Sequence, residues 1–162
     1  MKRWLAAVFS LFGLLGLGGC EPYLTSGIEP GVTRAAEVRE HLGAPGIEWR
    51  NPDGSVIWEY SMQPAGTRCY HLHIDQDGVV RAVDQVLTAQ NMARIVAGMD
   101  ETQVRRLIGK PAKTHVFALK QETVWDWHLG EDATRGKRYF NVYFDTAGRV
   151  TRTGHETVMP EN

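Results

Sequence analysis

The sequence predicts an α+β fold built from two tandem repeats, each with short helices packed on an antiparallel β-sheet. The first observation is internal repetition. Gly-Ala-Pro at 43–45 returns as Gly-Lys-Pro at 109–111, and Trp-Glu-Tyr at 58–60 returns as Trp-Asp-Trp at 125–127, so matched positions lie 66 to 67 residues apart. The second observation is periodicity, because in each copy apolar residues change from three- and four-residue spacing to strict alternation.

An export signal is predicted at residues 1–19. A positive pair precedes an apolar run, and small glycines lead directly into Cys20. This order is typical of a bacterial lipoprotein signal peptide, in which the cysteine is acylated and the chain is cut before it. We therefore predict lipidation of Cys20 and a lipidated tether over 20–27. An ordinary secretory signal is the alternative, but it would leave the cysteine unexplained.

The residue after the cysteine, Glu21, bears on the location of the protein. Lipoproteins of this kind that stay in the inner membrane of Gram-negative bacteria usually have Asp there, so the resemblance implies the periplasmic face of the outer membrane. The formal net charge of −1 gives no basic footprint for nucleic acid. Acyl chains would supply the membrane affinity. With Cys20 acylated, Cys69 has no partner for an internal disulfide.

The first repeat is predicted over residues 28–87. Thr33 is placed to cap a helix that ends at Gly43, with Val38 on its buried side. Strands are expected at 47–50, 56–60, 69–74 and 79–86, joined by turns rich in Asp, Asn, Pro and Gly. Alternation in the second and third strands directs their aromatic residues toward the helix as core.

The second repeat is predicted over 88–158, followed by a tail at 159–162. An additional helix is expected at 87–96, and Asp100 and Gln103 have the spacing of a capping box for the helix that ends at Gly109. Further strands are expected, with 114–119 a short candidate, and they end in a hairpin closed by Gly148. These elements complete a second helix-on-sheet unit.

The opposite face of each sheet is expected to be open, because helices cover only one side. Polar and aromatic side chains gather there, as at a protein-binding surface. The predicted partner-binding residues are Cys69, His71, His73, His128, Tyr139 and Tyr143. A merely solvated face is the competing interpretation.

Cys69, His71 and His73 alternate along one predicted strand and are candidate metal ligands. Residues two apart on a strand lie about 7 Å apart, so only neighbouring pairs could chelate a tetrahedral zinc ion, with Asp126 or His128 as a conceivable additional ligand. The second repeat has Tyr, Asn and Tyr at the matching positions. We therefore predict no metal site.

Catalytic patterns are also missing from the sequence. It contains no Gly-x-Ser-x-Gly elbow. Neighbouring acidic residues such as Asp75 and Asp77 fit turn formation better than acid–base catalysis. The sequence therefore predicts no catalytic residue, no cofactor and no enzyme activity.

Several of these residues resemble a known family. The run Gly98-Met99-Asp100 with Val104, Gly109 and Pro111, the Trp125-x-Trp127 pair, and the Phe140-x-Val142-x-Phe144 strand resemble the SmpA/OmlA (BamE-like) lipoproteins. Single-copy members of that family are outer-membrane lipoproteins that assist β-barrel assembly and have no known catalytic residues. A tandem pair of such units is similar to the fold of β-lactamase inhibitory proteins.

The resemblance implies a non-catalytic scaffold at the outer membrane. Its expected partners are the membrane itself, through the lipid anchor, and a protein of the β-barrel assembly machinery or of the periplasm. The expected role is β-barrel assembly or envelope integrity. The alternative is an inhibitor or sensor module that binds a periplasmic enzyme through the open sheet face.

Overall fold

The computed structural model describes residues 25–159, and they form an α+β fold with two four-stranded antiparallel sheets. This confirms the predicted fold class. Each sheet follows the chain order of its strands, β1-β2-β3-β4 and β5-β6-β7-β8. The predicted signal peptide at 1–19, Cys20 and most of the tether and tail lie outside the described residues.

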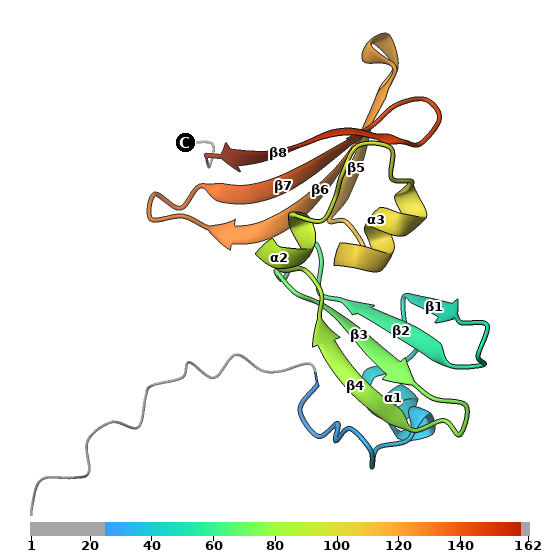
Figure 1. The fold of residues 1–162 in the computed structure, drawn as a ribbon. Coiled ribbons are helices and arrows are strands. Elements are labelled where there is room, and N and C mark those ends of the chain that lie inside the picture. Colours follow the sequence, from blue (N-terminus) through green and yellow to red (C-terminus); the bar gives the residue numbers. More distant parts are fainter. Residues whose placement is uncertain (1–24, 160–162) are drawn as a thin grey trace, which may run out of the picture.

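The first unit packs helix α1 on one face of the first sheet (Figure 1). Its elements are α1 (Ala35–Leu42), β1 (Ile47–Arg50), β2 (Val56–Ser61), β3 (Cys69–Ile74) and β4 (Val80–Gln85). The core between them is apolar and aromatic, as the alternation predicts. It contains Val38, Trp58, Tyr60, Tyr70, Leu72, Ile74 and Val80.

The start of α1 differs from the prediction by one residue. Arg34, not Thr33, is the N-cap residue, and its N–H donates to the Glu37 carboxylate at 2.8 Å. The hydroxyl of Thr33 instead accepts from the N–H of Glu29 at 2.8 Å and closes the preceding turn. Because that hydroxyl is already bound, it is not used to cap the helix.

The second unit repeats the arrangement with more helix and longer strands. Its elements are α2 (Ala89–Met92), α3 (Glu101–Ile108), β5 (Lys113–Phe117), the 3-10 turn η1 (Ala118–Lys120), β6 (Glu122–Glu131), β7 (Lys137–Phe144) and β8 (Val150–Val158). The predicted capping box is confirmed: Asp100 accepts from the N–H of Gln103 at 2.8 Å, and the reciprocal bond is 2.9 Å.

Two predicted segments in this unit are shorter than expected. The helix predicted at 87–96 is only Ala89–Met92, because the N–H of Ile95 bonds the carbonyl of Met92 three residues back, and the chain turns to bury Ile95. The strand predicted at 114–119 ends at Phe117, where a 3-10 turn begins. The Thr88 hydroxyl accepts from the N–H of Asn91 at 3.1 Å and caps α2.

The sequence repeat reappears as repeated geometry. Gly43 and Gly109 end α1 and α3 with nearly the same backbone angles, φ 78° and 79°. Tyr60 donates to the carbonyl of Gly43 at 2.9 Å, and the indole of Trp127 donates to that of Gly109 at 3.1 Å. An aromatic residue on the second strand therefore holds the end of the helix in both copies.

The two units stack through α3, which lies between the sheets (Figure 1). Val104 and Ile108 bury one side of α3 in the core of the second sheet, while Arg105 reaches Glu59 on the first sheet. The layers therefore run α1, first sheet, α3, second sheet. Among the described residues, no helix is long and apolar enough to cross a membrane.

Candidate functional site

The predicted binding surface is divided into a covered half and an uncovered half. We call the side of each sheet turned away from its own helix the far face. On the far face of the first sheet, Cys69 and His71 are 0% and 4% exposed, because α3 of the second unit lies over them. The prediction that this face is open is therefore wrong for these two residues.

Glu59 is the charged centre of the covered far face and is completely buried. Arg105 donates to both of its carboxylate oxygens, at 2.7 and 3.3 Å. Burial acts to raise the pKa of Glu59, but the interactions with His71 and Arg105 outweigh it and hold this pKa below its ordinary value. The carboxylate therefore stays ionised beneath α3.

Cys69 lies against the end of α3. A Cβ atom added to Gly109 would fall 2.1 Å from its sulfur, so only glycine allows this approach. Burial, followed by the nearby charge of Glu59, raises the pKa of the thiol to about 12. The side chain is therefore a neutral thiol at physiological pH and an inert packing group in this state.

The two histidines of β3 have different surroundings although they point to the same side. His71 Nε2 is buried and lies 3.7 Å from Glu59 Oε2, and no described residue is within hydrogen-bond distance of it. His73 lies near the surface, where its Nε2 pairs with Asp84 at 3.0 Å. The structure therefore separates the two residues that the strand pattern grouped.

Contacts at the rim hold the two units together. Gln63 bonds both backbone groups of His128, donating to its carbonyl at 2.9 Å and accepting from its N–H at 3.1 Å. Arg106 of α3 lies over the ring of Trp49, 4.8 Å from its centroid.

No described helix or strand lies over the far face of the second sheet (Figure 1). The strand register places His128, Tyr139 and Tyr143 on this face, with His128 at the end that Gln63 contacts. Asp126 is the counterpart of Glu59 in the strand register, since it faces Asn141 as Glu59 faces His71. It accepts from the Asn141 amide at 2.8 Å and pairs with His115 Nε2 at 3.0 Å. The acidic centre here is bound by residues of its own sheet, the buried Asn141 and the exposed His115.

A stacked ion pair borders this face. The Arg152 guanidinium lies over the ring of Tyr143, 3.4 Å from its centroid, and bonds both carboxylate oxygens of Glu122 at 2.7 and 3.3 Å. Gly154 on the same strand lies beside that ring, since an added Cβ would be in ordinary contact with it at 3.6 Å. Tyr143 is therefore held in a fixed orientation.

Tyr139 forms a second aromatic position. The ammonium of Lys113 lies 5.9 Å from its ring centroid, and the His128 ring lies 5.5 Å away. Both ring nitrogens of His128 are buried without a hydrogen-bond partner among the described residues. Sequence reasoning missed Lys113, but its position opposite Asp126 in the register would have indicated it.

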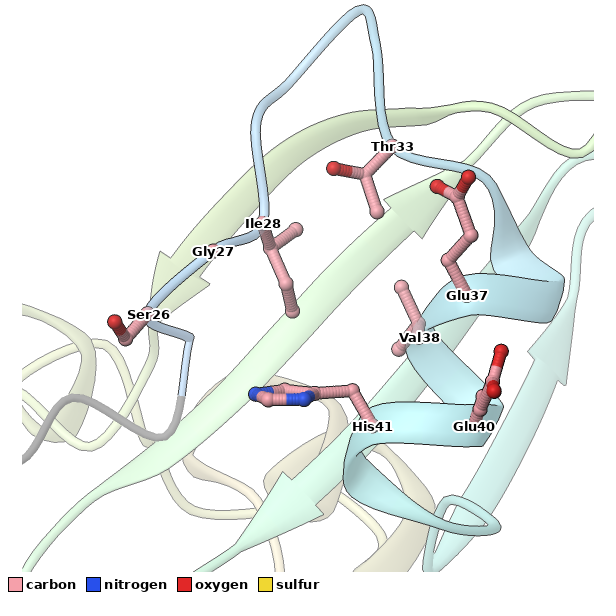
Figure 2. A pocket seen from close by; sticks show the side chains of 8 residues that line it. All are labelled: Ser26, Gly27, Ile28, Thr33, Glu37, Val38, Glu40 and His41. Atoms are coloured by element: carbon pink, nitrogen blue, oxygen red, sulfur yellow. The ribbon is translucent and has the colours of Figure 1, made fainter.

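A separate hollow of about 510 Å³ lies beside α1 (Figure 2). The hollow is lined by the segment before α1 and by α1 itself. Ile28 and Val38 face each other across it, and Glu37 and His41 lie on the helix side. None of the predicted site residues lines this hollow. The Glu37 carboxylate is already used to accept from the backbone at the start of α1.

Comparison with models of known protein families gives no match. Comparison with curated protein sequences gives none either. Among solved structures, one assigned as the osmotically inducible lipoprotein OsmE matches at 23% identity and a TM-score of 0.35, covering 46% of this chain and 75% of that chain. YjgB, a DUF4309 family protein from Bacillus subtilis subsp. subtilis strain 168, matches at 11% identity and a TM-score of 0.35, covering 84% and 86%.

Proposed function

We propose that this chain is a lipid-anchored, non-catalytic protein-binding module at the periplasmic face of the outer membrane, acting in β-barrel protein assembly or envelope integrity. The signal pattern that ends at Cys20 supports the anchor and the address. The likeness of its residues to the SmpA/OmlA lipoproteins supports the role. The far face of the second sheet is the proposed binding surface.

One observation carries the choice of surface: equivalent faces of the two sheets differ in whether they are covered. The far face of the first sheet receives a helix of the neighbouring unit, with Arg105 bound to Glu59. The far face of the second sheet has the same register and an acidic residue at the same place, Asp126. The contact between α3 and the first sheet is therefore an observed case of a helix packing on this kind of face.

The contact between Arg105 and Glu59 indicates which side chains a partner would present to the second sheet. A cationic side chain that approaches Asp126 would compete with His115, whose side chain is 46% exposed. Tyr139 and Tyr143 stand on the strand beside Asp126, and tyrosines are enriched among residues that dominate binding energy. We therefore expect the partner to present an Arg or Lys flanked by apolar side chains.

Photo-crosslinking in intact cells tests the surface. A photoreactive amino acid in place of Tyr143 or Arg152 is expected to capture a protein, to be identified by mass spectrometry. The same residue in place of Glu40 is the control, because Glu40 is exposed on α1 at the other end of the stack. Capture that is equal at Tyr143 and Glu40 would contradict the proposed surface.

The identity of the captured protein tests the role. Components of the β-barrel assembly machinery would support the proposed function. A soluble periplasmic enzyme would support the inhibitor or sensor alternative instead. Tyr143→Ala is expected to reduce recovery of the partner in a pull-down by more than Glu40→Ala does.

The anchor needs a test of its own. Labelled palmitate is expected to attach to the wild-type protein and not to Cys20→Ala. The variant should also lose its association with the membrane fraction, since the acyl chains supply that affinity. Labelling that persists in Cys20→Ala would contradict the assignment of Cys20.

A further inference from the structure

Beneath α3, three donor side chains of different chemistry converge. A carboxylate oxygen of Glu59, the sulfur of Cys69 and a ring nitrogen of His71 all lie within 4.8 Å of one another, and all three residues are buried. We propose that Glu59, Cys69 and His71 form a zinc-binding site between the two units.

The register of the first sheet explains why the donors meet. His71 lies directly opposite Glu59 on the neighbouring strand, and Cys69 precedes it by two residues and so points to the same face. Tetrahedral zinc with bonds of about 2.0–2.3 Å separates its ligand atoms by about 3.3–3.8 Å. The 3.7 Å between His71 Nε2 and Glu59 Oε2 already has this spacing.

The unsatisfied nitrogen of His71 points independently to a ligand. Its Nε2 atom is buried and has no hydrogen-bond partner within residues 25–159, although buried polar atoms almost always have one. The atom is directed toward Glu59, into the cluster. A metal ion bound there would take its lone pair and remove the unpaired polar group.

Arg105 binds the carboxylate of Glu59 and therefore competes with a zinc ion for it. A guanidinium and a zinc ion repel each other, so zinc binding requires Arg105 to release Glu59. Its side chain is 25% exposed, which gives it a route to solvent. Zinc would thus replace one contact between α3 and the first sheet.

Zinc binds the thiolate form of cysteine, so each ion bound would release the thiol proton of Cys69 to solvent.

Cobalt(II), a spectroscopic substitute for zinc, provides the test. Full-length protein in detergent is titrated with Co²⁺, and one equivalent is expected to produce thiolate-to-cobalt charge-transfer absorption in the near ultraviolet, removed again by Zn²⁺. Cys69→Ala is expected to abolish the absorption. His73→Ala is the matched control and should retain it, because His73 pairs with Asp84 outside the cluster.

Three further variants separate the proposed site from a general loss of structure. Arg105→Gln removes the competitor and is expected to bind Co²⁺ about tenfold more tightly or better, whereas His71→Gln should bind about 10–100-fold more weakly. Cys20→Ala must leave the absorption unchanged, which excludes the other cysteine. Circular dichroism confirms that each variant is folded.

Three results would each overturn the proposal. They are no charge-transfer absorption in the folded wild-type protein, full absorption in Cys69→Ala, and weaker binding by Arg105→Gln when that variant is folded. These results are independent of the partner experiments, so the zinc site and the proposed function can fail separately.

Discussion

The far faces of the two sheets have the same register but different surroundings. On the first sheet, Glu59 is completely buried and is bound by Arg105 from the other unit. On the second sheet, Asp126 is bound by His115 and Asn141 of its own sheet. Position in the stack, rather than the repeat pattern, decides whether the face is core or surface.

The helices show the same contrast. Arg39 and Arg105 occupy equivalent positions in α1 and α3, each four residues before the closing glycine. Arg39 pairs with Glu48 of its own unit and lies over Trp58, 4.4 Å from the ring centroid. Arg105 instead joins two units. One repeated position therefore serves local packing in one copy and assembly in the other.

The largest loss of stability is expected from breaking the ion pair between Arg105 and the buried Glu59. Arg105→Ala should lower the free energy of unfolding by about 3–5 kcal/mol, because it leaves the carboxylate of Glu59 buried and unpaired. Arg39→Ala should cost only about 1 kcal/mol, since its ion pair is solvent-exposed. Urea unfolding followed by circular dichroism measures both. Equal losses would show that the two positions do not differ as described.

A second comparison uses the glycines that end the two helices. Both have φ near 80°, so alanine is strained at either position by about 1–3 kcal/mol. An added Cβ meets nothing at Gly43 but would lie 2.1 Å from the Cys69 sulfur at Gly109. Gly109→Ala should therefore cost about 1–3 kcal/mol more than Gly43→Ala in the same unfolding assay.

A rescue variant checks the cause of that difference. Combining Cys69→Ala with Gly109→Ala removes the sulfur and should recover part of the added loss, whereas combining it with Gly43→Ala should not. Recovery in both backgrounds would mean that the clash with Cys69 is not the cause.

High pH should lower the free energy of unfolding through the Cys69 thiol on the covered face. The pKa of Cys69 is raised to about 12 from an ordinary value of 9.0. As the pH rises, the Cys69 thiol therefore loses its proton in the unfolded chain before it does so in the folded protein. The contribution of Cys69 to stability is complete below pH 9 and is lost as the pH rises toward 12. The loss is about 1.4 kcal/mol per pH unit within that window. Denaturation of wild type and Cys69→Ala at several pH values isolates this contribution, and parallel curves would contradict it.

The smallest effect on stability is expected on the uncovered face. Arg152→Ala should change the free energy of unfolding by less than about 1 kcal/mol, because its ion pair with Glu122 lies at the surface. Its effect should instead appear in partner recovery, because Arg152 holds Tyr143 in position. A large loss of stability with unchanged recovery would reverse the roles assigned to the two faces.

Local structure was largely predictable from the sequence, because caps and alternation act over a few residues. The capping box at Asp100, the strand at 47–50 and the inward aromatics all follow from spacing alone. The error at Thr33 arose because Glu29 takes its hydroxyl, and a sequence does not show which of two local hydrogen bonds forms.

The candidate site was only partly predictable. The patterns of β3 and β7 correctly placed His71 and Tyr139 on one side of their strands. They could not show that α3 would cover the first far face, because this depends on how two units separated along the chain stack in space. Cys69 and His71 are therefore predicted on an open face although both are buried.

A stack that alternates helix and sheet has two unlike ends. One end is α1, and the described chain begins near it, since Ser26 and Ile28 line the same hollow as that helix (Figure 2). The other end is the bare second sheet. If Cys20 is acylated as proposed, the anchor joins the molecule near its helical end, opposite the bare sheet. Such a module would meet its ligand at a distance from the bilayer, and the length of the tether would set how far it reaches.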